Sequence, residues 1–164
     1  MDLFLNGKVF VITGGAKGIG AAICRLIASG GGRVVIVDRD EQSNDLLVTE
    51  IKKSGGEASA ITMDLMLPES AGRAIGFAIE TYGSLYGLVN NAGINDRVGL
   101  ESGSVDQLEK SLRKNLFHYY AITREALPFL KKSKGSIVNI SSKTAETGQG
   151  GSSGYVAAKG AINA

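Results

Sequence analysis

Three residues in the last quarter of the chain have side chains that could carry out the oxidation of an alcohol. Tyr155 and Lys159 are four residues apart, so they share one face of a helix, and Ser142 lies thirteen residues before Tyr155. A phenolate can take the hydroxyl proton while hydride leaves the carbon, but a phenol with an unperturbed pKa of ~10 is only about a thousandth ionised at pH 7. The Lys159 ammonium favours the phenolate, and Ser142 can hydrogen-bond the substrate oxygen. We therefore predict that these three residues are catalytic, with Ser141 as a competitor for the serine.

A glycine-rich segment near the N-terminus predicts a site for a diphosphate. The segment follows the apolar run 8–13 and opens a helix, with the spacing G-x-x-x-G-x-G counted from its first glycine. Glycines let the backbone approach phosphate oxygens, and a helix N-terminus supplies free N–H groups and the positive end of the helix dipole. The cofactor contacts expected from this segment are Gly14, Lys17, Gly18, Ile19 and Gly20.

The charges that follow the second apolar run bear on the choice between two nicotinamide cofactors. Asp38 lies 18 residues after Gly20, close to the ~20-residue offset of a ribose-binding acid. Its carboxylate can accept hydrogen bonds from the ribose hydroxyls and would repel a 2′-phosphate, which favours NAD. Lys17 and Arg39 can attract a 2′-phosphate, so NADP stays open. The alternative for Asp38 is an ordinary turn acid.

Apolar runs alternate along the chain with segments of helical periodicity. We expect strands at 8–13, 33–38, 58–63, 85–90 and 136–140, and helices at 18–29, 41–53, 68–82, 104–130 and from about 154. Pro68 is expected in the first turn of its helix, and Gly83 just past the end. This alternation predicts an α/β fold, a doubly wound parallel sheet of strand order 3-2-1-4-5 with a ligand crevice between strands 1 and 4. No repeat or linker is visible, so residues 1–164 are expected to form a single dinucleotide-binding domain.

Taken together, these motifs resemble the short-chain dehydrogenase/reductase family. Residues 13–20 match its TGxxxGxG motif, residues 90–93 match its NNAG motif, and the serine, tyrosine and lysine follow in the family's order. The resemblance runs through the whole chain, and the order of its motifs makes it specific. It implies a Rossmann-type oxidoreductase that transfers hydride between NAD or NADP and an alcohol or carbonyl.

The resemblance also implies roles for residues that spacing alone does not single out. Asp64 and Leu65 match the pair that borders the adenine, and Asn91 belongs to the NNAG motif at the cofactor. Asn115 matches the family's catalytic asparagine, which holds a water that links Lys159 to solvent. The alternative for Asn115 is a side chain that only bridges backbone groups.

Two loop stretches, 90–96 and 139–150, look most similar to sugar dehydrogenases of the L-fucose dehydrogenase type. Asn95, Lys143 and Gln149 stand there together with Ser142 and Tyr155, and polar groups at this edge could bind the hydroxyls of a sugar. The alternative is that these loops are polar only because they are exposed to solvent. Reductases of 3-oxoacyl or steroid substrates also remain open.

Members of the family continue after the Tyr-Lys helix with two more strands and a substrate-covering loop, whereas this sequence ends five residues after Lys159. We therefore expect a fold truncated at that helix. A non-catalytic nucleotide-binding protein remains an alternative. Full-length members usually assemble through the long helix and the Tyr-Lys helix, so a homo-oligomer is expected for a full-length protein.

The overall composition bears on other function classes. A net charge of +2, from 18 basic and 16 acidic residues, is too balanced to favour nucleic acid or an anionic membrane as partner. The single cysteine, Cys24, and the single histidine, His118, do not suffice for a usual zinc site, and both are expected to be packed. The N-terminus 1–4 lacks the features of a signal peptide and no apolar run spans a bilayer, so the cytoplasm is the expected location.

Overall fold

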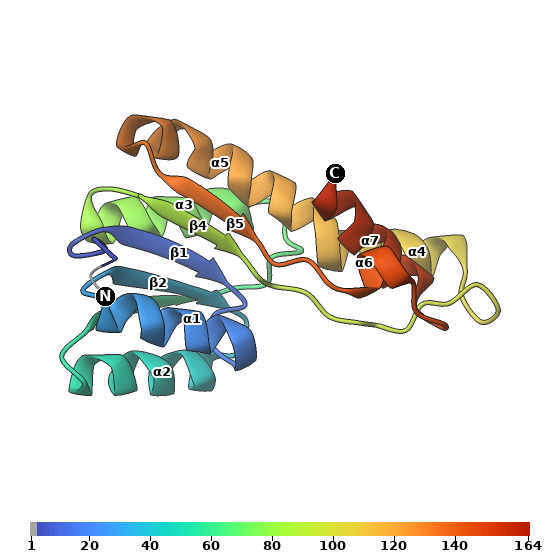
Figure 1. The fold of residues 1–164 in the computed structure, drawn as a ribbon, viewed down its shortest axis with the longest axis horizontal. Helices are drawn as coiled ribbons and strands as arrows, with labels where there is room; N and C mark the ends of the chain where they lie inside the picture. The colour runs from blue at the N-terminus through green and yellow to red at the C-terminus, as the bar shows by residue number, and fades with distance from the viewer. Residues whose placement is uncertain (1–2) are drawn as a thin grey trace.

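The computed structural model describes residues 3–164 and contains one parallel sheet with the strand order β3-β2-β1-β4-β5 (Figure 1). The strands are β1 (Val9–Thr13), β2 (Arg33–Asp38), β3 (Glu57–Thr62), β4 (Gly87–Asn90) and β5 (Ser136–Asn139). The predicted α/β fold and strand order are confirmed. Residues 1 and 2, on which the signal-peptide prediction partly rests, lie outside the described residues.

Helices cover both faces of this sheet. They are α1 (Gly18–Ser29), α2 (Glu41–Lys53), α3 (Ser70–Tyr82), α4 (Val105–Leu112), the π-helical turn η1 (Arg113–Phe117), α5 (His118–Ser133), α6 (Thr144–Thr147) and α7 (Ser153–Asn163). Helices α1 and α2 lie on one face, and α3 and α5 lie on the other (Figure 1). Helices α4, α6 and α7 gather beyond the carboxyl ends of the strands (Figure 1). No helix within residues 3–164 is both long and apolar enough to cross a membrane.

Strand β1 is buried on both faces, which explains its unbroken apolar sequence. Val9 and Val11 pack in the core beneath α3 and α5, whereas Phe10 and Ile12 pack in the core beneath α1 and α2. Successive side chains of a strand point to opposite faces, so a central parallel strand must be apolar at every position. Strand β5, by contrast, is exposed at all four positions, and its outer edge pairs with no described strand.

Element boundaries agree with the sequence patterns to within a few residues, and α2 matches its predicted range. The helix expected at 68–82 begins at Ser70, so the prediction that Pro68 lies in its first turn is wrong. A tight turn precedes this helix, because the Ser70 N–H and hydroxyl both donate to the Leu67 carbonyl. Gly83 closes the helix in the left-handed conformation, as expected. Strand β3 begins one residue earlier than predicted, and β4 begins two residues later.

The long helix expected at 104–130 is interrupted. Ser104 caps α4 by accepting a hydrogen bond from the Gln107 N–H at 3.2 Å, and the chain then widens into the π-helical turn η1 before α5 continues to Ser133. Asn115 lies in the widened turn, where its Nδ2 donates to the Ser111 carbonyl at 3.0 Å. π-Helical turns of this kind are often found at functional sites. The predicted loop after β5 also contains the four-residue helix α6.

Candidate active site

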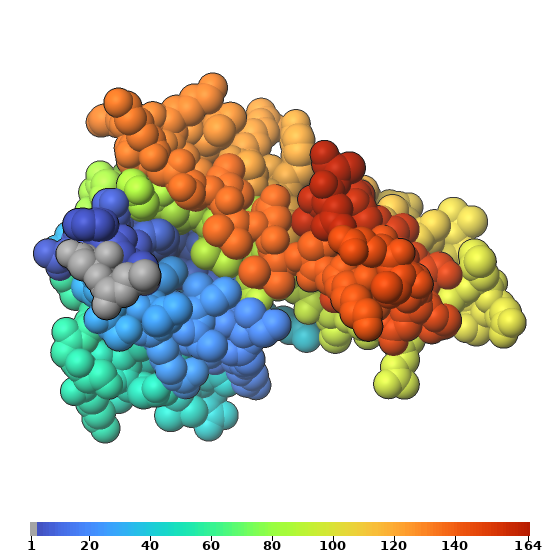
Figure 2. Space-filling view, viewed as in Figure 1, coloured from blue at the N-terminus to red at the C-terminus, as the bar shows by residue number. Residues whose placement is uncertain are grey.

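Two adjoining cavities open at the carboxyl ends of β1 and β4, where the strand order reverses. Their volumes are about 450 Å³ and about 390 Å³, and both are lined by Gly14, Asp38, Ala92 and Gly93. The molecular surface is hollowed between the N-terminal helices and the C-terminal elements (Figure 2). A parallel sheet of this kind binds ligands at such a reversal point, so the crevice predicted between strands 1 and 4 is present.

The two cavities collect most of the predicted cofactor residues. The first cavity is lined by Gly14, Asp38, Arg39, Asp64 and Leu65, and the second by Gly14, Lys17, Gly18, Ile19, Asp38, Asn91, Tyr155 and Lys159. Gly20 is the one cofactor candidate that lines neither cavity. It is buried, and a Cβ there would lie 2.2 Å from the Gly14 carbonyl oxygen. This glycine therefore allows α1 to pack closely against the glycine-rich turn.

Gly14 needs its missing side chain for two reasons. Its φ is +60°, a backbone conformation that other residues rarely adopt, and a Cβ would lie 2.8 Å from the Ala92 Cα. The turn after β1 thus passes directly against the turn after β4. The result is a crevice walled by backbone on both sides.

Asn91 holds these two turns together. Its Nδ2 donates to the carbonyl oxygens of Thr13 at 3.0 Å and Gly14 at 2.9 Å. In the opposite direction, Thr13 Oγ1 accepts from the backbone N–H groups of Asn91 and Ala92. The side chain that was predicted to contact the cofactor therefore also clamps the carboxyl ends of β1 and β4.

Asp38 lies half-buried at the end of β2 with its carboxylate fixed by backbone donors. One oxygen accepts from the Ala16 N–H at 3.2 Å and the other from the Asp40 N–H at 3.1 Å. Asp40, which the sequence reasoning missed, caps α2 by accepting from the Ser43 N–H at 2.9 Å, and it forms an ion pair with Lys17. An acidic residue directly before a helical pattern is a recognisable capping signal. The hydrogen bond from Lys17, followed by those from Ser43, lowers the pKa of Asp40 to about 2.

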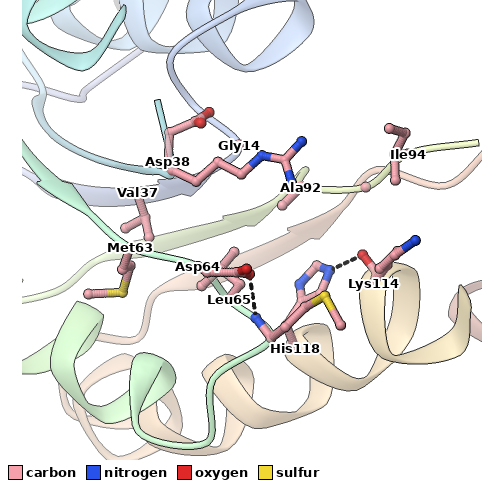
Figure 3. A pocket seen from close by; sticks show the side chains of 13 residues that line it. Gly14, Val37, Asp38, Met63, Asp64, Leu65, Ala92, Ile94, Lys114 and His118 are labelled. Carbon is pink, nitrogen blue, oxygen red and sulfur yellow. Dashed lines mark hydrogen bonds between the residues drawn. The ribbon is translucent and has the colours of Figure 1, made fainter. Parts of the chain in front are cut away.

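The first cavity is bordered by Asp64, in the loop after β3, and by His118, the first residue of α5 (Figure 3). Asp64 accepts a hydrogen bond from the Met66 N–H at 2.9 Å, and the His118 Nε2 lies 2.8 Å from the Lys114 carbonyl oxygen. His118 is 4% exposed, so the prediction that it is packed is confirmed. Burial lowers its pKa. Its place on the cavity wall was missed, although it stands one helical turn after Asn115.

Lys159 is the most deeply buried charged side chain of the second cavity, with 2% exposure. Its Nζ donates to the Ile140 carbonyl oxygen at 2.7 Å and to the Tyr119 hydroxyl at 3.0 Å, and it lies 5.8 Å from the centre of the Tyr155 ring. Helix α7 therefore presents Tyr155 and Lys159 on one face, as their spacing predicted. Burial lowers the pKa of Lys159 to about 8.

Asn115 is fully buried and joins the π-helical turn to the loop after β4. Its Oδ1 accepts a hydrogen bond from the Ile94 N–H at 2.7 Å, while its Nδ2 is held by Ser111. Its side chain thus bridges two backbone groups, and the catalytic role expected for Asn115 from the family resemblance stays a prediction. A Cβ at Gly93 would lie 3.0 Å from Asn115 Oδ1 and 3.5 Å from Lys159 Nζ, so the asparagine stands beside the lysine.

The two candidate serines differ in their partners. Ser142 Oγ lies 2.9 Å from Thr144 Oγ1 and accepts from the Thr144 N–H at 3.2 Å, at the start of α6. Ser141 Oγ donates to the Lys159 carbonyl oxygen at 3.1 Å and lines the second cavity. The structure thus puts Ser141 on the cavity wall, and it puts Ser142 just outside the lining.

The predicted substrate residues of the two loops are brought partly together. Asn95 Nδ2 donates to Gln149 Oε1 at 3.4 Å, across 54 positions of sequence, whereas Lys143 is exposed. The neighbouring Asp96 is bound internally to Ser111 and Lys114. None of Asn95, Lys143 and Gln149 lines either cavity.

Comparison with known proteins gives a consistent picture. A sequence model of the short chain dehydrogenase family matches residues 8–164. The 2,5-dichloro-2,5-cyclohexadiene-1,4-diol dehydrogenase LinX of Sphingobium indicum is 39% identical over 159 residues, 96% of this chain and 64% of that protein. The L-fucose dehydrogenase of Rattus norvegicus is 38% identical over 160 residues, 97% of this chain and 58% of that protein.

A solved structure, the crystal structure of Cj0485 dehydrogenase, has a TM-score of 0.91 and 44% identity and covers 99% of this chain and 62% of that one. The chain thus spans 58% to 64% of the length of these proteins. Since the family match includes the glycine turn, the crevice and the Tyr155–Lys159 helix, this chain belongs to the short-chain dehydrogenase family.

Proposed function

We propose that this chain holds the cofactor cradle and the catalytic side chains of an NAD-dependent oxidoreductase that interconverts an alcohol and its carbonyl compound. One observation carries the proposal. The buried Lys159 ammonium lies beside the Tyr155 ring in a cavity that is continuous with the glycine turn of β1. A phenol next to a buried cation, beside a diphosphate-sized cradle, is suited to move a proton while hydride moves to a nicotinamide.

The residues of the crevice fit a dinucleotide. Gly14 and Gly18 have positive φ and leave the backbone uncovered, and helix α1 starts there with no side chain capping its first N–H groups. These N–H groups would hold the diphosphate. Asp38 would accept hydrogen bonds from the adenosine ribose, and Lys159 would hold the nicotinamide ribose. The bound nicotinamide would supply the hydride acceptor or donor.

The side chains of the second cavity have separate tasks in the proposed reaction. Tyr155 would take the hydroxyl proton of an alcohol, or return it to a carbonyl oxygen in the reverse direction. Lys159 would stabilise the phenolate through its charge. Ser142 would hydrogen-bond the substrate oxygen, for which its hydroxyl must turn from Thr144; Ser141 is the competitor for this task. Asn115 would anchor the turn beside Lys159.

Two acids favour NAD over NADP. Asp38 stands where a 2′-phosphate would lie, and Lys17, a cation that could attract this phosphate, is paired with Asp40. Arg39 is exposed and forms no ion pair within residues 3–164, so it remains the one nearby side chain that favours NADP. With Lys17 and Asp40 paired, the Asp38 carboxylate, which would repel a 2′-phosphate, supports NAD.

A polyhydroxylated ring is the substrate class that we propose, with a sugar such as L-fucose as the first candidate. The names of the relatives, a cyclohexadiene-diol dehydrogenase and an L-fucose dehydrogenase, both refer to hydroxyl-bearing compounds. The Asn95–Gln149 pair adds exposed amide donors and acceptors on the two loops. These groups suit hydroxyl groups better than the hydrocarbon of a steroid or an acyl chain.

The test measures NADH formation at 340 nm with NAD and a panel that contains L-fucose, other free sugars, cyclic diols and a steroid alcohol. We expect turnover with a sugar or diol that disappears in Tyr155→Phe, while the affinity for NAD, measured by calorimetry, stays within a few-fold. Turnover confined to the steroid would contradict the substrate class. NAD binding without turnover on any compound would mean that this chain is a nucleotide-binding protein only.

A further inference from the structure

A second tyrosine, Tyr119 on α5, lies in direct contact with the proposed catalytic lysine. Its hydroxyl accepts a hydrogen bond from Lys159 Nζ at 3.0 Å and donates one to the Ile140 carbonyl oxygen at 3.0 Å. Tyr119 is 4% exposed. Nothing in the spacing of the catalytic residues points to it, because it stands 40 positions before Lys159.

We propose that Tyr119 is a positioning residue for Lys159, which keeps the ammonium charged and fixed beside Tyr155. This proposal rests on the proposed function of Lys159. The hydrogen bonds have only one consistent direction, since an ammonium can only donate and a carbonyl can only accept. The Tyr119 hydroxyl therefore donates its hydrogen bond to the Ile140 carbonyl oxygen and accepts the hydrogen bond from the Lys159 ammonium.

The contact matters because the ammonium has few other partners. Within the described residues it makes no ion pair, and its second hydrogen bond goes to the same Ile140 carbonyl that Tyr119 already contacts. Lys159, Tyr119 and Ile140 thus form a closed triangle of hydrogen bonds that ties α7 to α5 and to the end of β5. A buried charge without an acceptor is costly, so the Tyr119 oxygen should add directly to the stability of the charged form.

Tyr119 is suited to this task because it stays neutral itself. Burial raises the pKa of its phenol, followed in size by the effect of Tyr155. The other titratable group of α5 that faces this region is His118, whose own pKa is lowered by burial and, to a lesser degree, by the Lys159 charge.

Within the described residues, no acid on the neighbouring elements pairs with the Lys159 ammonium. Glu109 of α4 pairs with Arg113 on the surface, Lys114 of η1 pairs with Asp96, and Glu146 of α6 is exposed. The Tyr119 hydroxyl is therefore the side-chain group that accepts a hydrogen bond from the Lys159 ammonium.

The experiment compares Tyr119→Phe with the wild type, and with Tyr120→Phe as the matched control, because Tyr120 is 75% exposed on the same helix. Loss of the acceptor should weaken the charged form of Lys159, which then stabilises the Tyr155 phenolate less. We expect the rising limb of the pH profile of kcat for alcohol oxidation to move to higher pH by about one unit. KM should change little, and Tyr120→Phe should leave the profile in place.

A second measurement does not depend on turnover. The Lys159 Nζ of chain labelled with ¹⁵N-lysine is titrated by NMR, where we expect its midpoint to fall in Tyr119→Phe and to stay constant in Tyr120→Phe. Site-specific 3-fluorotyrosine at position 119 keeps the ring and the hydroxyl, so it serves if Tyr119→Phe fails to fold. As a weaker acceptor, it should produce a smaller shift of the same sign.

The outcomes separate the two proposals. A lower Lys159 midpoint in a chain without any turnover would support the Tyr119 contact and would contradict the proposed enzyme function. An unchanged midpoint and an unchanged pH profile, with only a lower melting temperature, would make Tyr119 an ordinary packing residue and overturn the inference.

Discussion

Lys17 Nζ lies 2.5 Å from the Asp40 carboxylate, and this ion pair joins a lysine that lines the second cavity to the residue that caps α2. Because Lys17 of the glycine turn is paired with Asp40, its ammonium is less available to a 2′-phosphate. We therefore propose that the choice between NAD and NADP depends on Asp40, which lies two residues after the proposed ribose-binding acid Asp38.

Asp40→Asn should therefore improve binding of NADP. The freed Lys17 ammonium can then reach a 2′-phosphate, and because exposed ion pairs are weak, we expect a gain of at most roughly five-fold in NADP affinity relative to NAD. Calorimetric titration with both nucleotides measures the ratio. Glu50→Gln, which breaks the exposed Arg25–Glu50 pair on the surface, is the control that should leave the ratio unchanged. If both variants have the same ratio of NADP affinity to NAD affinity, Lys17 does not contribute to the selectivity between the two cofactors.

Gly14→Ala should weaken both folding and NAD binding. The added Cβ meets the Ala92 backbone at 2.8 Å and the backbone has φ +60°, so we expect a loss of roughly 1–3 kcal/mol in the free energy of unfolding. Urea denaturation measures it. Gly76→Ala, in the middle of α3 with nothing within 4 Å of an added Cβ, is the matched control and should stabilise by about 0.5–1 kcal/mol. If both variants change the free energy of unfolding by the same amount, the close approach of the two turns does not explain the effect of Gly14→Ala.

Lys159→Met should change how stability depends on alkaline pH. Burial lowers the pKa of Lys159 from 10.5 to about 8. Between these values the unfolded chain binds more protons than the folded chain, so this residue makes the free energy of unfolding rise with pH across that window. In Lys159→Met we expect this contribution to vanish and stability at pH 7 to increase by roughly 1–3 kcal/mol.

The measurement is a set of urea melts from pH 7 to pH 10.5, read as the difference between variant and wild type. This difference cancels the opposite contribution of Cys24, whose thiol pKa burial raises to about 12. Lys52→Met in the last turn of α2 serves as an exposed-lysine control. A pH-independent difference would contradict the burial of a charged Lys159.

His118 should make the fold sensitive to mild acid. Burial lowers its pKa below the ordinary value of 6.5, so its contribution to stability is complete above pH 6.5 and is lost as the pH falls through its lowered folded value. It is the only histidine of the chain, which makes its titration easy to assign. We expect chemical denaturation between pH 7 and pH 5 to show a decline that is smaller in His118→Gln. The same decline in both proteins would assign it to carboxyl groups instead.

The sequence by itself determined the elements and the chemical groups that they carry. Unbroken apolar runs predicted β1 and β2, the polar segment 41–53 gave the bounds of α2, and the four-residue spacing put Tyr155 and Lys159 on one helical face. These features are local, because the periodicity of an element and its capping residues depend on neighbours a few positions away.

Only the tertiary structure decided which residues meet. The contacts of Tyr119 with Lys159 and of Lys17 with Asp40 join residues 40 and 23 positions apart, and no periodicity encodes them. Gly20, which is predicted to contact the cofactor, also allows the close approach of α1 to Gly14, and the π-helical turn at Asn115 interrupts a regular helical pattern. Such features depend on how α1 and α5 pack on the sheet and how α7 packs on α4 and η1. That packing balances burial and hydrogen bonding over the whole core rather than along one element.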